Sequence, residues 1–475
     1  MVFSDPVFIF LFLPLCVVAY LALGGKFRLL VVNVIGLIFY TWDGGSFVNL
    51  ILIQTLLTFV FGILVGKSRG KRNASLAILS LGIALNLGSL LYFKYAGFGI
   101  EIFNSLASKF GISEVGPVNH LLPLGISFFT FQFLSYLIDI YRGVSSPAPE
   151  LRKFFAYILL FPHLIAGPIV RYAEINSELV SAKRNRLQDV SDGFPRFFWG
   201  LSKKILIADQ AANISNLIFG LPDNRITFAT AWIAAITYSI QIYFDFSGYS
   251  DMAIGLARML GFTFPENFDR PYSAVSVTDF WRRWHITLSR WFRDYVYFPL
   301  GGNRKGKYKT YRNLSIVFLL TGIWHGANWT FLVWGAFHGG LLILERITNA
   351  GGGSTSRFWV VRRFSTYLLV CIGWVIFRSE SITQSAVFIR AMFSPTSIEV
   401  SNEVMNVLTL QHLLWTFIGL FSVLLPHRVR VGKWLSYSDS KFSGVTRLLV
   451  VALPGTLSLI YAMSGTFSPF LYFQF

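Results

Sequence analysis

The chain has 475 residues, of which 54% are hydrophobic, 17% aromatic and only 13% charged, and its mean hydropathy is +0.57. Soluble domains carry about 25% charged residues. The composition therefore excludes an ordinary soluble fold and predicts a membrane protein that crosses the lipid bilayer many times.

Charge and cysteine content exclude two further classes. The net charge of +18 would suit a nucleic-acid partner, but a basic cytoplasmic face explains it in a membrane protein, and we expect no nucleic acid. Cys16 and Cys371 both lie in apolar runs. This excludes a disulfide framework and a thiolate metal cluster, and we predict no metal site and no permanently bound cofactor.

Apolar runs of about 20 residues, the length that crosses a bilayer core, recur along the whole chain. Four runs without Asp, Glu, Lys or Arg cover residues 7–23, 47–65, 74–93 and 407–425. Further spans are predicted near 197–220, 227–252, 313–345 (a bent pair), 364–377 and 446–463. We predict one all-α integral membrane domain over residues 1–475, with about 10–13 spanning or re-entrant helices, interfacial helices, and C-terminal spans in 406–475.

Basic residues alternate between successive loops. Loop 67–72 holds four Lys and Arg residues, whereas loop 43–46 holds none. This bias predicts basic loops on the cytoplasmic side, an extracytoplasmic N-terminus and an extracytoplasmic segment 378–405. Segment 154–170 is short, contains two prolines and has basic loops on both sides, so we interpret it as re-entrant. His120 and His427 are expected at span ends.

The segment between residues 279 and 312 is basic and aromatic, with nine basic residues, two acids and three tryptophans. Such a composition is typical of a helix lying in the membrane interface, with aromatic rings at headgroup level. The plainer interpretation is an interfacial anchor. The functional alternative is a docking surface for an anionic cosubstrate or an acidic partner, with phosphate contacts from Arg282, Arg283 and Arg290. His285 lies inside this segment.

The stretch "TGIWHGANWTF" (321–331) places an ionisable residue in an apolar run. Helical spacing predicts Thr321, His325 and Trp329 on one ridge, with Trp324 and Asn328 on the next. Intramembrane ionisable residues are rare and usually functional, and histidine is the commonest general base.

The alternative for a histidine in a span is a packed, hydrogen-bonded ring, which we favour for His163, His338 and His412. Glycines four apart, at 322 and 326 and at 335 and 339, predict closely packed helices.

A polar stripe runs through "YSIQIYFDFSGYSDMA" (238–253). Gln241, Asp245 and Tyr249 share one helical face. Because such a stripe is costly against lipid, it should face the protein interior or a water-filled tunnel, where it would help to position a substrate.

Several segments in a fixed order resemble the membrane-bound O-acyltransferase (MBOAT) family, most closely its bacterial alginate-acetylating branch. They include "PLGISFFTFQFLSYLIDIYRG", "FPHLIAGPIVRY", "YFDFSGYSDMAIGLARMLGF", "NFDRPY", "FWRRWHITLSRWFRDYVYFPLGGNR", "LTGIWHGANWTF" and "GWVIFR". Each is weak alone, and together they are highly specific. The family's "WHG" histidine maps onto His325, and its upstream polar site maps onto His285.

The resemblance implies acyl transfer across the bacterial cytoplasmic (inner) membrane. An acyl thioester, expected to be acetyl-CoA acting as cosubstrate, enters from the cytoplasm, and the acyl group passes through a polar tunnel enclosed by the helices to an acceptor hydroxyl reached from outside. In that picture His325 removes the acceptor's proton or hydrogen-bonds the reacting oxygens, and His285 positions the thioester. A periplasmic partner with an SGNH-hydrolase-like fold would place the acetyl group on an exported polysaccharide.

Two other classes explain many of the same features. A multi-pass transporter or flippase would have many spans, a re-entrant segment and a polar stripe, but no thioester cleavage. A scaffold subunit would tolerate His325→Ala. Within the family, transfer of D-alanine to teichoic acid from a carrier protein and acetylation of peptidoglycan remain alternatives.

Overall fold

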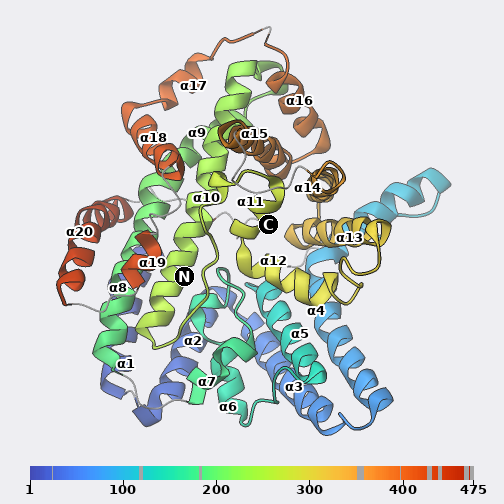
Figure 1. The fold of residues 1–475 in the computed structure, drawn as a ribbon, viewed down its shortest axis with the longest axis vertical. Helices are drawn as coiled ribbons and strands as arrows, with labels where there is room; N and C mark the ends of the chain where they lie inside the picture. The colour runs from blue at the N-terminus through green and yellow to red at the C-terminus, as the bar shows by residue number, and fades with distance from the viewer. Residues whose placement is uncertain are drawn as a thin grey trace. The chain divides into compact units, whose positions relative to one another are not determined.

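The computed structural model describes residues 1–23, 25–116, 121–180, 185–349, 358–395, 397–424, 431–436, 441–464 and 470. Within these ranges every regular element is a helix (Figure 1), which confirms the all-α prediction. His120 and His427, with their expected positions at span ends, lie outside the described residues. The chain forms two compact units.

The first unit comprises Met1, residues 10–190 and residues 256–265. Its helices are α1 (Leu13–Leu23), α2 (Arg28–Gly44), α3 (Phe47–Lys67), α4 (Arg72–Ala107), α5 (Ile126–Arg142), α6 (Leu151–Ile158) and α7 (Tyr172–Val180). Helices α3, α4 and α5 pack on one another (Figure 1). Arg69, in the basic loop after α3, donates hydrogen bonds to the carbonyl oxygens of Ile140 and Ser145. These bonds join loop 67–72 to the end of α5 and the loop that follows it, both predicted on the cytoplasmic side.

The proline-containing segment 154–170 is enclosed within this unit. After α6 a short 3₁₀ turn covers Phe161–His163, and the backbone is then non-helical up to Val170. Residues 156–170 are all buried, and the His163 ring lies 2.8 Å from the Tyr157 carbonyl oxygen through Nε2. Burial by protein is what non-helical backbone at membrane depth requires. The side from which this segment enters the membrane remains a prediction.

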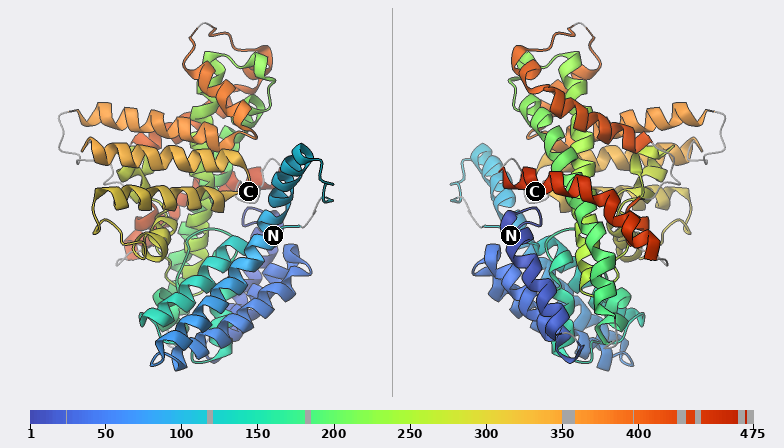
Figure 2. Two further views of the ribbon diagram at one scale, coloured as in Figure 1. Left: turned by 90° about the vertical axis from the view of Figure 1, so that its right-hand side faces the viewer. Right: turned by 90° about the vertical axis from the view of Figure 1, so that its left-hand side faces the viewer.

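The second unit comprises residues 2–9, 191–255 and 266–475. It holds most of α8 (Arg186–Ser202) and α10 (Phe228–Met259), and α9 (Asp209–Phe219) follows a π-helical turn, Lys203–Ala208. The later helices are α11 (Val277–Arg283), α12 (Ile286–Phe292), α13 (Lys307–His325), α14 (Trp329–Ile347), α15 (Trp359–Arg378), α16 (Ile382–Met392), α17 (Asn402–Val407), α18 (Leu410–Leu424), α19 (Val431–Ser436) and α20 (Lys441–Met463). Figure 2 shows α13, α14 and α15 side by side.

Helices α13 and α14 form the predicted bent pair, and glycines set their separation. A Cβ atom added at Gly322 would stand 2.3 Å from the Phe331 carbonyl oxygen, and one at Gly335 would stand 2.4 Å from the Phe318 carbonyl oxygen. Only glycine therefore permits this backbone approach. The close packing predicted from the glycine spacing is confirmed.

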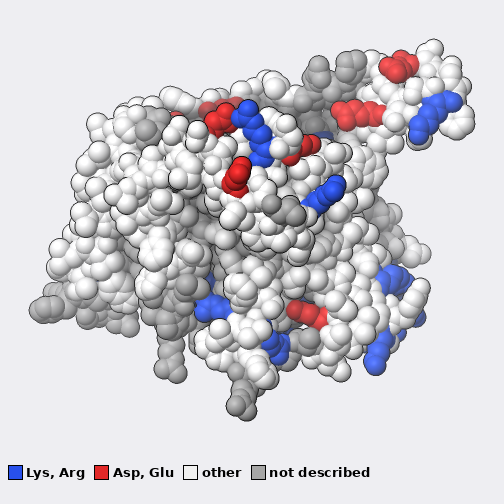
Figure 3. Space-filling model, turned by 90° about the horizontal axis from the view of Figure 1, so that it is seen from above, with Lys and Arg blue, Asp and Glu red and all other residues white. Residues whose placement is uncertain are grey.

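Among the described residues, five helices are long and apolar enough to cross a membrane: Phe47–Lys67, Arg72–Phe110, Trp329–Ile347, Trp359–Arg378 and Val445–Met463. Shorter apolar helices cover Phe8–Leu23 and Leu410–Val423. All seven overlap predicted spans. Figure 3 shows one face of the molecule, on which charged side chains are few and scattered among uncharged ones. The protein is thus a multi-pass membrane protein.

Candidate active site

His285 occupies a break between two short helices. Its backbone lies in the left-handed region, at φ +43° and ψ +55°, between α11 and α12. This conformation costs a residue with a Cβ atom roughly 1–2 kcal/mol, so surrounding contacts must hold it. The segment is therefore not one continuous helix, because the chain turns sharply at His285, and its location in the membrane interface stays a prediction.

The tryptophans of this segment are buried in protein. Trp281, Trp284 and Trp291 are between 4% and 8% exposed. Trp281 contacts Phe318 with ring centroids 5.2 Å apart, and Trp284 contacts Trp374 at 4.7 Å. The three rings thus pack against protein, and the depth of this segment in the membrane stays a prediction.

His325 is the last residue of α13. Gly326 continues in extended backbone, and α14 begins at Trp329, so the predicted ridge through Thr321, His325 and Trp329 is broken. Asn328 is the N-cap of α14: its side-chain oxygen accepts from the Thr330 amide, and its Nδ2 donates to the Glu380 carbonyl oxygen. The structure thus gives Asn328 a capping role.

Trp324 joins the two histidines, which are 40 residues apart in the sequence. Its ring centroid lies 6.3 Å from that of His285 and 4.9 Å from that of His325. Further contacts at 5.1 Å place Trp334 and Phe377 against His325. Both imidazoles are buried, at 1% and 7% exposure. The two predicted catalytic residues therefore belong to one cluster of packed aromatic rings, and neither lines the cavity described next.

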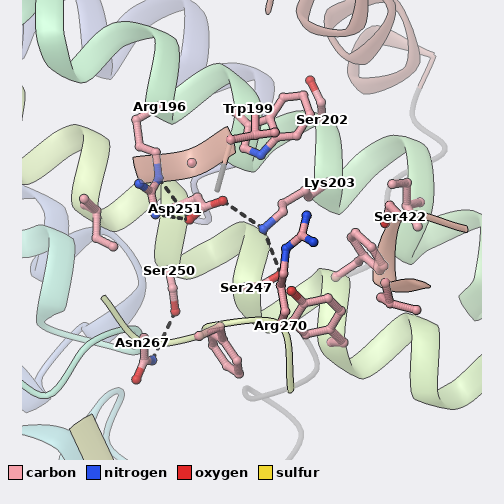
Figure 4. Close-up of a pocket in the computed structure, with 18 of the residues that line it drawn as sticks. Arg196, Trp199, Ser202, Lys203, Ser247, Ser250, Asp251, Asn267, Arg270 and Ser422 are labelled. Carbon is pink, nitrogen blue, oxygen red and sulfur yellow. Dashed lines mark hydrogen bonds and ion pairs between the residues drawn. The ribbon is translucent and has the colours of Figure 1, made fainter. Parts of the chain in front are cut away.

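A cavity of about 410 Å³ reaches the segment that carries His285. Its walls come from α8, α10, α18, α20 and residues 266–270 (Figure 4). Asn267 lines the cavity, and it also accepts from the His285 ring, with 3.1 Å between Oδ1 and Nδ1. Tyr243, Phe268 and Trp415 give the cavity an aromatic lining. Its size and mostly apolar walls are typical of a small-molecule site.

A buried ionic network stands on the cavity wall (Figure 4). Arg196 pairs with Asp251 at 2.6 Å and with Glu266 at 2.8 Å, and Lys203 reaches the other Asp251 oxygen at 2.9 Å. Lys203 also donates to the Ser247 hydroxyl. Sequence reasoning missed these residues. The sequence pattern that could have revealed two of them is the spacing of four residues between Ser247 and Asp251. This spacing places both on one face of α10, a different face from that of the predicted stripe.

The predicted polar stripe is buried and has partners within the protein. Asp245 pairs with Lys204, 2.7 Å away, and Gln241 accepts from the Ser215 hydroxyl at 2.5 Å. Tyr249 stacks on Phe3 at 4.7 Å. The expectation that the stripe faces the protein interior is confirmed, but these three residues do not line the cavity.

The three arginines predicted to contact phosphate differ in their surroundings. Arg283 pairs with Asp279 at 2.9 Å, whereas Arg282 is exposed and Arg290 is half-buried. The Arg283 carbonyl oxygen accepts from the backbone amide of Asp269, which lines the cavity, at 2.9 Å. Arg270, also on the cavity wall, is a second residue in the left-handed region, at φ +50°. Arg283 is thus joined to the cavity wall through its backbone, while its side chain pairs with Asp279.

Comparison with known proteins identifies the class to which this fold and pocket belong. Residues 144–351 match the model of the MBOAT, membrane-bound O-acyltransferase family. The whole chain is 41% identical to a probable alginate O-acetylase of Pseudomonas putida, over the full length of both. It is 33% identical to a peptidoglycan O-acetyltransferase of Helicobacter pylori, covering 82% of this chain and 80% of the relative. A teichoic acid D-alanyltransferase of Bacillus subtilis is 30% identical over 56% of this chain and 70% of the relative.

The chain belongs to the membrane-bound O-acyltransferase family. It is therefore a membrane-embedded enzyme that transfers an acyl group to an oxygen acceptor, as the order of motifs predicted.

Proposed function

We propose that the protein transfers an acetyl group from a cytoplasmic thioester, acetyl-CoA, across the inner membrane toward an extracytoplasmic hydroxyl, for O-acetylation of an exported polysaccharide. One observation carries the proposal: His285 and His325 pack on the same indole, and the His285 ring is bound to Asn267, which lines a cavity. The relatives named as alginate and peptidoglycan acetylating enzymes support an acetyl group and a polysaccharide acceptor.

In the proposed reaction the acceptor oxygen attacks the thioester carbonyl carbon. A C–O bond forms, the C–S bond breaks, and the hydroxyl proton passes through His325 to the departing sulfur, so that the products are an ester and a thiol. General-base assistance of this kind contributes roughly 10²–10⁴-fold to the rate. His285, which packs on the same Trp324 ring, helps to position the thioester.

Positive charge at the cavity supports a donor that carries phosphates. Arg270 on the cavity wall, and Arg283, whose backbone is bound to Asp269 of that wall, are suited to the phosphates of the cosubstrate. For Arg282 and Arg290 we propose only that their charges, in the same segment, attract these phosphates. A periplasmic SGNH-hydrolase-like acetyltransferase is the proposed recipient of the acetyl group.

The proposed direction requires an extracytoplasmic N-terminus and cytoplasmic basic loops. Within the second unit, Arg225 in the loop before α10 pairs with Glu403 at 2.9 Å, in the segment that the loop charges predict outside. Cysteine labelling tests this, because both native cysteines are buried. A membrane-impermeant maleimide added to intact spheroplasts should label Asp223→Cys and spare Gly70→Cys. The opposite pattern would reverse the proposed orientation.

The first experiment follows radiolabelled acetyl-CoA with the purified protein in nanodiscs, with and without the periplasmic partner and polymer. Wild type should cleave the thioester, and His325→Ala and His285→Ala should lose most of that activity. His412→Gln is the matched control, since its ring contacts the Val407 carbonyl oxygen and Asn213 away from the pocket. Binding of acetyl-CoA without cleavage, even with partner and polymer, would favour a transporter or a scaffold.

A further inference from the structure

We propose that Asn267 is a positioning residue, which fixes His285 in the tautomer that carries its proton on Nδ1 and leaves Nε2 as the basic nitrogen. Its catalytic meaning rests on the proposed function, whereas the tautomer itself is a property of the ring that is measured without substrate. Asn267 lies 18 residues before His285 in the "NFDRPY" segment and is fully buried.

The orientation of the Asn267 amide is settled by an obligatory donor. The Thr287 backbone N–H can only donate, and it reaches the Asn267 side chain at 3.3 Å. The accepting atom is therefore the amide oxygen, and the Thr287 hydroxyl donates to the same atom at 2.9 Å. The other end of the amide, Nδ2, donates to the Ser250 hydroxyl at 3.2 Å. Reversing the amide would set two N–H groups against each other.

The hydrogen bond to His285 then fixes the imidazole proton. His285 Nδ1 lies 3.1 Å from the same amide oxygen, and an oxygen that only accepts requires N–H at Nδ1. Burial lowers the pKa of His285 to about 3, so the ring is neutral at physiological pH and has one donor and one acceptor nitrogen. Nε2, on the ring edge that points away from Asn267, is thus the acceptor.

Backbone hydrogen bonds hold the segment around Asn267 against the segment around His285, whose backbone is left-handed. The Ile286 amide donates to the Asn267 carbonyl oxygen, and the Asp269 amide donates to the Arg283 carbonyl oxygen, both at 2.9 Å. His285 therefore stands in its left-handed conformation between two backbone hydrogen bonds to the Asn267 segment. Left-handed backbone in a residue with a Cβ atom persists only when the surroundings enforce it.

This assignment changes the expected part of His285 in the reaction. A neutral ring with its proton on Nδ1 accepts a hydrogen bond through Nε2 and does not donate one to the thioester carbonyl. His285 should therefore bind an N–H, O–H or S–H group of a substrate, such as an amide N–H of the thioester arm or the acceptor hydroxyl.

The test is ¹⁵N NMR of histidine-labelled protein in nanodiscs, in which the protonated and unprotonated ring nitrogens resonate far apart. His285→Gln assigns the His285 signals among the seven histidines. Wild type should have its proton on Nδ1. Asn267→Asp keeps an acceptor oxygen and should retain this tautomer, whereas Asn267→Leu should lose it. The leucine variant should also have a kcat lower by about 10–100-fold, the cost typical of removing the hydrogen-bond partner of a functional histidine. Its KM for acetyl-CoA should change less. Asn86→Leu, which removes a buried amide bound to the Gly82 carbonyl oxygen, should leave the tautomer and kcat unchanged.

Two results would overturn the proposal: a wild-type proton on Nε2, or an Asn267→Leu protein with the wild-type tautomer. Because the wild-type spectrum decides the first point, misfolding of a variant does not remove the test. A proton on Nδ1 in a protein that never cleaves acetyl-CoA would uphold the positioning role and reject the proposed function.

Discussion

The imidazole of His285 and the indole of Trp324 are in contact, with ring centroids 6.3 Å apart and planes at 63°. Trp324 directly precedes His325 on α13, so this one ring couples the break between α11 and α12 to the end of α13. A reaction that uses both histidines depends on their relative placement, and both imidazoles pack on this indole.

Replacing Trp324 should therefore impair catalysis more than binding. Trp324→Leu removes the ring on which both imidazoles pack and which we expect to set their spacing. A misplacement of about 1 Å costs up to 10²-fold in rate. We expect kcat for acetyl transfer to fall by about 10–100-fold with a smaller change in KM for acetyl-CoA. Trp329→Leu makes the same replacement at a half-exposed position and should retain activity. Equal kcat values for both variants would reject the spacing role.

The contact between α13 and α14 is expected to be intolerant of a single methyl group. Gly335→Ala places a Cβ atom 2.4 Å from a backbone oxygen, which cannot move without separating the helices. Overpacking costs about 1–3 kcal/mol, so the thermal unfolding midpoint should fall. Gly340, in the same helix, has no atom within 4 Å of an added Cβ, and Gly340→Ala should leave the midpoint unchanged or raise it. Equal midpoints for the two variants would contradict this packing.

The sequence was sufficient for the features that rest on local patterns. Long apolar runs without charges predicted the spans, and glycines four residues apart predicted the close α13–α14 contact. The order of motifs predicted the family and singled out His285 and His325. The spans and the helix contact follow from helix length and helix periodicity, which are properties of neighbouring residues. The family and its two histidines were identified by resemblance.

The features that depend on distant residues were not predictable in this way. The turn at His285 is enforced by Asn267, 18 residues earlier, and composition does not signal a left-handed histidine. Tryptophans among arginines look alike in an interfacial helix and in a buried one, so the burial of Trp284 had no distinguishing pattern. The cavity wall combines α8, α10, α18 and α20, which only the tertiary fold brings together.

The backbone of His285 should be relieved by glycine. Glycine occupies the left-handed region without the steric cost that other residues incur, so His285→Gly should unfold at a higher temperature than His285→Ala, by the equivalent of about 1 kcal/mol. Both variants should be inactive in acetyl transfer, because both lack the imidazole. Differential scanning of the two proteins in the same detergent measures the difference. A less stable glycine variant would argue against strain at this residue.

Protonation of His285 should destabilise the folded protein in acid. Burial among Phe246, Phe268 and Trp324 lowers its pKa from an ordinary 6.5 to about 3. Between these values the unfolded chain binds a proton that the folded chain does not, so stability is full above pH 6.5 and is lost as pH falls toward 3. His285→Gln removes this contribution, and its unfolding midpoint should depend less steeply on pH between 6 and 4. Parallel pH curves for wild type and variant would show that His285 does not titrate this way.

The Asp251 carboxylate should be the most sensitive member of the cavity-wall network. It is buried and faces two cations, so Asp251→Ala removes one carboxylate that pairs with Arg196 and the carboxylate that pairs with Lys203, while Glu266 stays paired with Arg196. Breaking a buried ion pair by removing one partner costs about 3–5 kcal/mol, and we expect the lower end because Glu266 remains. Asp223→Ala removes an exposed carboxylate and should change stability by less than about 0.5 kcal/mol. The two variants are compared by thermal unfolding in one detergent. If the two variants unfold at the same temperature, the ion pairs of Asp251 contribute little to stability. Other groups that line the cavity would then balance the charges of Arg196 and Lys203.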